Sequence, residues 1–405
     1  MLKYFYFFAL AVLFSCNKSD ENQLKSTDEL TQEKLEMGLQ SFQWQLFQDL
    51  VSVESNTDNL NISPLSVAAA LYMTYQGAAD DTRIQMAKSL GLGNDTLNLG
   101  YAFESLIQEL EGPGNILHSA NAVFWDKDRM HPKSDFLDYS QKYFKADPNP
   151  LTFSDPSALN KINDWVKTAT NGRIEKIIEQ ISAEEIMYLM NALYFKADWR
   201  YPFAEESTRE NEFELADGSM VVTDMMFQDI NTLRFYQQND FTSVELPFAD
   251  TSYSIILLLP PKGLSCNTFI AGLDGSRLEK LYTTDLVRGR IYLQVPKFEI
   301  EYKILLNEVL KKMGMEIAFD PNLADFSNLG SGSEGNLFIS RVSHRTYLKI
   351  DEKGAEGAAV TSVGIGETSA PPLLSFDRPF VFLLRNNQTG TLIFTGKIEN
   401  PSHSK

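Results

Sequence analysis

The chain has 405 residues, of which 43% are hydrophobic, so it is long enough for one large domain with a sizeable core. It carries 36 Lys and Arg residues against 54 Asp and Glu residues, a formal net charge of −18. Such an acidic surface repels phosphate backbones and anionic polysaccharides, which argues against nucleic acid as a partner. Only two cysteines occur, Cys16 and Cys266, so no disulfide framework is expected, and Cys266 is expected to be packed.

The first 16 residues have the layout of a secretory signal. Lys3 precedes an apolar run over residues 4–14 that is too short to span a bilayer. The ending Leu13-Phe14-Ser15-Cys16 resembles a bacterial lipobox, which implies lipidation at Cys16, whereas an ordinary signal containing a cysteine is the alternative. Residues 17–21 resemble the acidic tag of some surface lipoproteins, although a solvated linker explains them almost equally well. We therefore expect an exported lipoprotein of the outer membrane, exposed at the cell surface.

The sequence predicts that the rest of the chain is a tether followed by one domain. Residues 17–35 are polar and without apolar periodicity, which indicates a flexible tether, and residues 36–405 form the domain. Helical periodicity dominates up to about Gly112 and returns over residues 158–178. Strand-like runs cover residues 121–125, 190–195, 252–260 and 290–300, and the last third is mainly β-like. Helices and strands mixed without strict alternation predict an α+β fold.

The sequence offers little catalytic machinery. The four histidines (His118, His131, His344 and His403) lack metal-ligand spacing and have no cysteine pair beside them, so no metal site is expected. No Gly-x-Ser-x-Gly elbow occurs. Residues 330–335 fit a dinucleotide-binding pattern, but a loop precedes them and a strand-like run follows, which is the wrong context. We expect neither enzymatic activity nor a cofactor, and a hydrolase or carbohydrate-binding function has no supporting motif.

The unusual segment is residues 352–372, which are small, rich in Gly and Ala, and free of Pro until Pro371. Long loops of this kind are usually functional or disordered. Its alternate residues form a face that is entirely small or apolar, as in a half-buried strand. That face consists of Ala355, Gly357, Ala359, Thr361, Val363 and Ile365. The segment can therefore exist as an exposed loop or as a strand, and each residue before Pro371 can offer its N–H to a neighbouring strand.

Several motifs in this chain resemble those of the serpin family. The hinge resemblance is carried by Glu352, Gly354, Ala355, Glu356, Gly357, Ala358, Ala359, Val360 and Thr361. Further blocks that match are residues 59–66, 77–82, 191–199, 295–298, 324–327, 376–380 and 394–401. The resemblance covers about residues 36–402. It implies a single-domain serpin fold with three β-sheets, eight to nine helices and an exposed reactive-centre loop over about residues 352–375.

The resemblance also implies a function. Inhibitory serpins are suicide substrates of serine endopeptidases, and in some cases of cysteine endopeptidases, that trap the acyl-enzyme by inserting the cleaved loop into the main sheet. Ala355, Gly357 and Val360 depart from the usual hinge residues, but the first two remain small and Val360 lies on the outward face. We therefore expect an inhibitor. The alternative is a non-inhibitory serpin acting as a binding or chaperone-like protein.

The family spacing from Glu352 places the bait bond at Thr368–Ser369, with Ile365 and Glu367 as alternative bait positions. No Lys or Arg lies between Glu356 and Pro372, so elastase-like or subtilisin-like targets are favoured over trypsin-like ones. Residues 101–111 contain three Glu and no Lys or Arg, so heparin activation is not expected. We expect a monomer whose contact with the membrane is made through its lipid.

Two further sets of residues match family positions. Ser63, Ser66, Asn191 and His344 match the polar shutter beneath the centre of the main sheet, and an ordinary satisfied core cluster is the alternative interpretation. Lys297 and Glu352 match a charge pair where the loop enters the sheet.

Overall fold

A computed structural model describes the backbone of residues 19–92, 98–112, 116–274, 286–333, 335–355 and 371–402, and side chains from residue 32 onward. The α-helices in these ranges are α1 (Ser19–Val53), α2 (Pro64–Gly77), α3 (Asp80–Ser89), α4 (Leu99–Glu111), α5 (Ser134–Phe144), α6 (Ser157–Ala169), α7 (Cys266–Ala271) and α9 (Asn307–Leu310). Shorter helical turns are η1 (Glu205–Ser207), η2 (Lys311–Met315) and η3 (Ile317–Phe319). None of the described helices is both long and apolar enough to cross a membrane.

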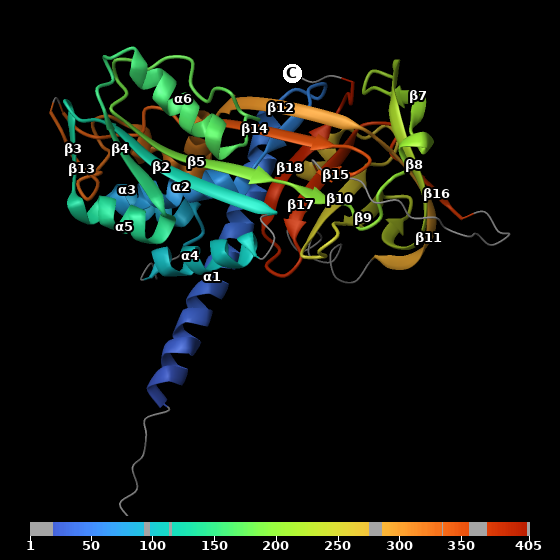
Figure 1. The fold of residues 1–405 in the computed structure, drawn as a ribbon, viewed down its shortest axis with the longest axis horizontal. Helices are drawn as coiled ribbons and strands as arrows, with labels where there is room; N and C mark the ends of the chain where they lie inside the picture. Colours follow the sequence, from blue (N-terminus) through green and yellow to red (C-terminus); the bar gives the residue numbers. More distant parts are fainter. Residues whose placement is uncertain are drawn as a thin grey trace, which may run out of the picture.

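Two helices differ from the prediction. Helix α1 extends back to Ser19, through most of the segment expected to be a flexible tether, and its first half projects from the body (Figure 1). The segment is rich in Glu, Gln, Leu and Lys, which are good helix formers, so the helix continues without an apolar face. The helix predicted over residues 158–178 ends at Ala169, because Asn171 and Gly172 adopt positive φ angles of 49° and 81°.

The largest sheet has nine strands and runs through the centre and one end of the molecule (Figure 1). Its order is β1 (Leu60–Ile62), β18 (Leu392–Ile398), β17 (Phe380–Asn386), β10 (Tyr253–Leu259), β9 (Thr242–Pro247), β8 (Met220–Gln237), β11 (Val287–Pro296) and β16 (Leu373–Ser375), with β7 (Arg209–Glu214) paired to β8. Strands β10, β17 and β18 are buried along their whole length, and their runs of apolar residues are those predicted from the sequence.

A second layer consists of two sheets that lie edge to edge. One has the order β4 (Ala146–Leu151), β2 (Leu117–Asp126), β5 (Met187–Phe195), and the other pairs β12 (Phe298–Leu305) with β14 (Ser343–Ile350). Two small ladders complete the described strands: β3 (Met130–Pro132) with β13 (Gly330–Gly332), and β6 (Ala197–Asp198) with β15 (Gly354–Ala355). The described strands therefore form five hydrogen-bonded sheets where three were expected, in part because no ladder joins β5 to β14.

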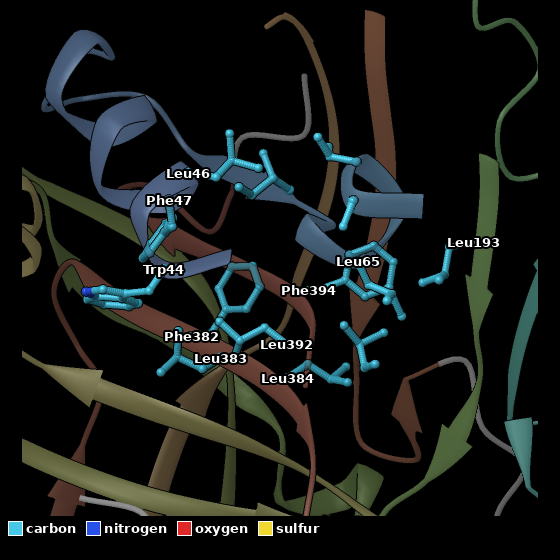
Figure 2. Packing of buried hydrophobic residues seen from close by; sticks show 14 of the residues in the cluster. Trp44, Leu46, Phe47, Leu65, Leu193, Phe382, Leu383, Leu384, Leu392 and Phe394 are labelled. Carbon is cyan, nitrogen blue, oxygen red and sulfur yellow. The ribbon is translucent and has the colours of Figure 1, made fainter. Parts of the chain in front are cut away.

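The main core lies between these layers and the helices. Figure 2 shows Trp44 and Phe47 of α1 packing toward Phe382 of β17 and Leu392 of β18. Helix α2 begins with a Ser63 side-chain cap followed by Pro64, and it contributes Leu65 to the same core. A second, smaller cluster lies between α6 and the β2–β5 sheet. Strand β5 is therefore covered on both faces.

Candidate functional site

The site is a slot between β5 and β14, which lie side by side in Figure 1 without a ladder between them. Three cavities line up along it, each bordered by residues of both strands. The cavity beside residues 187–191, at the end of the slot here called lower, has a volume of about 450 Å³. The two cavities beside residues 191–195, toward the end here called upper, measure about 10 Å³ each. A strand between two others pairs with both, so an unpaired slot is the geometry that an added strand requires.

The four residues expected to form a polar shutter lie together at the middle of this slot. The N–H of Ser63 donates to Nε2 of His344 over 3.0 Å. The N–H of Ser66 donates to Oγ of Ser63 over 3.3 Å, and its own hydroxyl reaches the backbone carbonyl of Asn191 over 3.4 Å. Helix α2, β5 and β14 are thus joined by one chain of hydrogen bonds.

Two further polar residues belong to this cluster and were not predicted. The Asn191 amide donates to Oγ of Ser119 and to Oδ1 of Asn121, both over 2.9 Å, which ties β5 to β2. Oδ1 of Asn191 is buried and has no hydrogen-bond partner among the described residues. Ser119 and Asn121 carry no local signal, because the β2–β5 pairing alone brings them to Asn191.

His344 is held in its neutral form. Its side chain is buried, and burial lowers the pKa of the imidazole to about 4. Because Nε2 accepts the proton of the Ser63 N–H, the ring carries its own proton on Nδ1. The shutter is therefore a network of dipoles with no net charge at neutral pH.

The charge pair at the upper end of the slot is present. Nζ of Lys297 lies 3.2 Å from Oε1 of Glu352, and that oxygen also accepts the hydroxyl of Thr208 over 2.7 Å. Burial would raise the pKa of Glu352, but the hydrogen bonds from Thr208 and Lys297 outweigh it and hold the pKa below its usual range. The backbone carbonyl of Glu352 also accepts the N–H of Phe203. Glu352 is thereby fixed at the point where the chain leaves β14.

Two hinge residues already pair with β6, the short strand that follows β5. Gly354 and Ala355 form β15, which pairs antiparallel with β6 in the register Gly354–Asp198 and Ala355–Ala197. Gly354 has a φ angle of +150°, and a Cβ there would lie 2.1 Å from the carbonyl oxygen of Ala197. Only glycine fits this close approach. The Ala355 side chain is 1% exposed and belongs to the main core.

The remaining predicted residues lie outside the described part of the chain. They are Cys16, the hinge residues Glu356, Gly357, Ala358, Ala359, Val360 and Thr361, and the bait positions Ile365, Glu367, Thr368 and Ser369. The described chain resumes at residue 371, and β16 then pairs parallel with β11. The two anchors of the loop are therefore β15 and β16.

Within the described residues, no group of three or more His, Cys, Asp and Glu side chains could hold a metal ion. Cys266 is buried, and burial raises the pKa of its thiol well above the usual value.

Comparison with known proteins agrees with this geometry. The model of the family described as "Serpin (serine protease inhibitor)" matches residues 37–401. Plasminogen activator inhibitor 1 of Sus scrofa is 31% identical over 369 residues, which cover 86% of this chain and 89% of that protein. The chain belongs to the serpin family.

Solved structures of serpins share the fold. The thermophilic serpin tengpin in its native state has a TM-score of 0.82 and 33% identity, covering 92% of this chain and 94% of the other. Human thyroxine-binding globulin also has a TM-score of 0.82, with 28% identity, covering 93% of this chain and 100% of the other. The α+β serpin fold expected from the sequence motifs is confirmed.

Proposed function

We propose that this serpin inhibits endopeptidases as a suicide substrate, by inserting its cleaved loop as a strand between β5 and β14. One observation carries the proposal: the unladdered slot begins where β15 has already paired with β6. Strand β6 continues β5 across Lys196, so the chain beyond Ala355 would run antiparallel to β5 if it kept its direction. The family itself consists mostly of protease inhibitors.

The register of β15 predicts how the inserted loop would pair. Continuing it gives the pairs Gly357–Phe195, Ala359–Leu193, Thr361–Asn191, Val363–Leu189 and Ile365–Met187. Directly opposed residues in an antiparallel pair point to the same face. Phe195 and Leu193 face the main core, as Ala355 does. The small, apolar face of the loop would therefore be the buried face.

Insertion supplies the driving force. Each new backbone hydrogen bond contributes roughly 0.5–1.5 kcal/mol net, and an inserted strand forms ladders with both β5 and β14. The loop residues Val363 and Ile365 would reach the lower part of the slot, beside the 450 Å³ cavity, which is lined mainly by apolar side chains. Burying them adds hydrophobic stabilisation.

The proposed reaction is an acyl transfer that stops halfway. The protease nucleophile attacks the carbonyl carbon of Thr368, the bond to the nitrogen of Ser369 breaks, and the amine leaves after accepting a proton from the protease. An ester then joins Thr368 to the protease. Insertion displaces the protease, and a displacement of about 1 Å at its catalytic groups already costs roughly 10²-fold in rate, so water does not complete hydrolysis.

The proposed bait favours proteases with small or medium apolar specificity pockets, elastase-like or subtilisin-like. Thr368 occupies the bait position, and Ile365 and Glu367 are the alternatives if the loop spacing shifts. A papain-like cysteine protease would form a thioester with the same carbonyl carbon, so the proposal includes these proteases as targets.

The test is incubation of residues 36–405 with elastase-, subtilisin-, trypsin- and papain-like proteases, followed by a denaturing gel. An SDS- and boiling-resistant band at the summed masses would support trapping, and the mass of the released C-terminal peptide would identify the bait bond. Cleavage within residues 356–372 with full protease activity remaining, across the whole panel, would contradict the proposal.

That second outcome would favour a non-inhibitory serpin acting as a binding or chaperone-like protein. Its support is the similarity to human thyroxine-binding globulin, whose structure was solved in complex with thyroxine.

We also propose that the protein is an outer-membrane lipoprotein, exposed at the cell surface and anchored through Cys16. The support is the lipobox-like Leu13-Phe14-Ser15-Cys16 and the apolar run before it. Mass spectrometry of the mature N-terminus tests this, because a diacylglyceryl-modified Cys16 is expected, and an unmodified N-terminus would contradict it.

A further inference from the structure

The segment between α6 and β5, residues 170–186, lies over the slot and is here named the strap. Ile174 and Ile177 of the strap border the same cavities as Leu193 of β5 and Thr346 and Tyr347 of β14. Asn163 of α6 fixes the strap from its own side, accepting the N–H groups of Ile177 and Ile178 at 2.9 and 3.2 Å. The strap is thus continuous with β5 and attached to α6.

Polar contacts also fasten the strap to the opposite side of the slot. The strongest is at the lower end, where Oε1 of Glu185 lies 2.5 Å from Nη2 of Arg341, two residues before β14. The other carboxylate oxygen, Oε2, accepts the Ser182 N–H over 2.8 Å and the Tyr188 hydroxyl over 2.6 Å. Glu185 is 3% exposed and Arg341 is 30% exposed, so the carboxylate of this ion pair is desolvated and both of its oxygens have partners.

The upper contacts are weaker. Oε1 of Glu179 lies 3.2 Å from Nζ of Lys303 on β12, and both side chains are about half exposed. Arg345 of β14 also bonds the backbone carbonyl of Lys176. Exposed ion pairs contribute little. The lower contact between Glu185 and Arg341 is therefore the one that can hold the slot closed.

We propose that the Glu185–Arg341 ion pair is a latch that limits how fast the loop enters the slot. This proposal rests on the proposed insertion mechanism. An added strand pairs with both neighbours, so it needs β5 and β14 to lie about 9.6 Å apart, which is two ladder spacings. The 2.5 Å contact joins the β5 side to the β14 side, so the ion pair breaks before the lower slot opens. The latch thereby governs whether a bound protease is trapped or completes hydrolysis and escapes.

The experiment compares insertion rates in variants of the full chain. The loop is nicked within residues 356–372 by a low-specificity protease, and insertion is followed by tryptophan fluorescence, since Trp199 bonds the carbonyl of Asp351 beside β15. Glu185→Gln is expected to insert about tenfold faster, which corresponds to ~1.4 kcal/mol of barrier. Arg341→Gln should match it, and the double variant should gain nothing further.

Two controls separate the latch from general destabilisation. Glu175→Gln and Lys167→Gln each break the ion pair between the strap and α6, which does not cross the slot. Both are expected to insert within twofold of the parent rate. The latch is overturned if Glu185→Gln keeps the parent rate or if either control accelerates equally.

The two proposals fail differently in this experiment. A nicked parent protein that shows no rise in thermal midpoint would contradict insertion itself. A nicked parent protein that becomes more stable, with equal insertion rates in all variants, would leave insertion intact and contradict only the latch.

Discussion

The backbone N–H of Ser63 donates to Nε2 of His344 over 3.0 Å, which joins the start of α2 to β14. Because this bond requires an unprotonated Nε2, it ties stability to the charge of the imidazole. The pKa of His344 is lowered by burial to about 4, from an unfolded value near 6.5.

The first prediction concerns stability and pH. Between pH 6.5 and about 4 the unfolded chain binds a proton at His344 that the folded protein excludes, so the free energy of unfolding falls as pH falls through this window. The loss is on the order of 3 kcal/mol. Urea unfolding at several pH values measures it, with His344→Asn as the comparison. Equal slopes in parent and variant over that window would contradict the assignment.

The second prediction concerns Glu352. Glu352→Gln removes the charge that pairs with Lys297, and we expect about 1–2 kcal/mol lower stability at pH 7. A double-mutant cycle with Lys297→Met should give a coupling energy of about 1 kcal/mol, because Lys297 is partly exposed. Since the pKa of Glu352 is lowered, this contribution is present above about pH 4.5 and is lost as pH falls through the folded pKa. A coupling energy of zero at pH 7 would show that the Lys297–Glu352 pair does not contribute to the free energy of unfolding.

The third prediction concerns a buried cation far from the slot. Lys397 is fully buried, and its Nζ contacts the Ser55 carbonyl, Oδ1 of Asn267 and a carboxylate oxygen of Glu399 at 2.6, 2.7 and 3.1 Å. Lys397→Met leaves Glu399 buried without its cation, so we expect a loss of about 3–5 kcal/mol.

Replacing both charges should cost less than replacing one. Lys397→Met combined with Glu399→Met removes the uncompensated carboxylate, and chemical denaturation should recover at least half of the lost stability. A double variant no better than Lys397→Met would mean that the hydrogen bonds of Lys397 to Ser55 and Asn267, rather than its charge, stabilise this corner.

The fourth prediction uses the two faces of the loop. Ala359→Glu places a carboxylate opposite Leu193, on the face that would enter the main core, whereas Ala358→Glu changes the other face by the same side chain. Burying an unpaired charge costs several kcal/mol. We expect Ala359→Glu to lower the yield of protease complex at least tenfold and Ala358→Glu to change it far less. Equal yields would contradict the register derived from β15.

Local patterns predicted much of the structure correctly. The apolar runs that became β10, β17 and β18 are fully buried strands, because full burial selects continuous apolar residues, and the run in β5 is mostly buried. Gly354 was identified from the hinge motif, and the structure adds the reason, which is the approach of its backbone to Ala197. The end of α6 was missed, although Asn171 and Gly172 carry a local stop signal.

The amino-acid sequence by itself determined the family, and it predicts the hinge and the alternation of the loop, because these depend on neighbouring residues or on motif order. Only the tertiary structure decided that β5 and β14 lie side by side unpaired, that Ser119 and Asn121 meet Asn191, and that Glu185 reaches Arg341. Those contacts join segments that are distant in the chain. They are determined by strand pairing and by packing between the layers. No local periodicity encodes which strands become neighbours, so the slot became visible only once the layers were assembled.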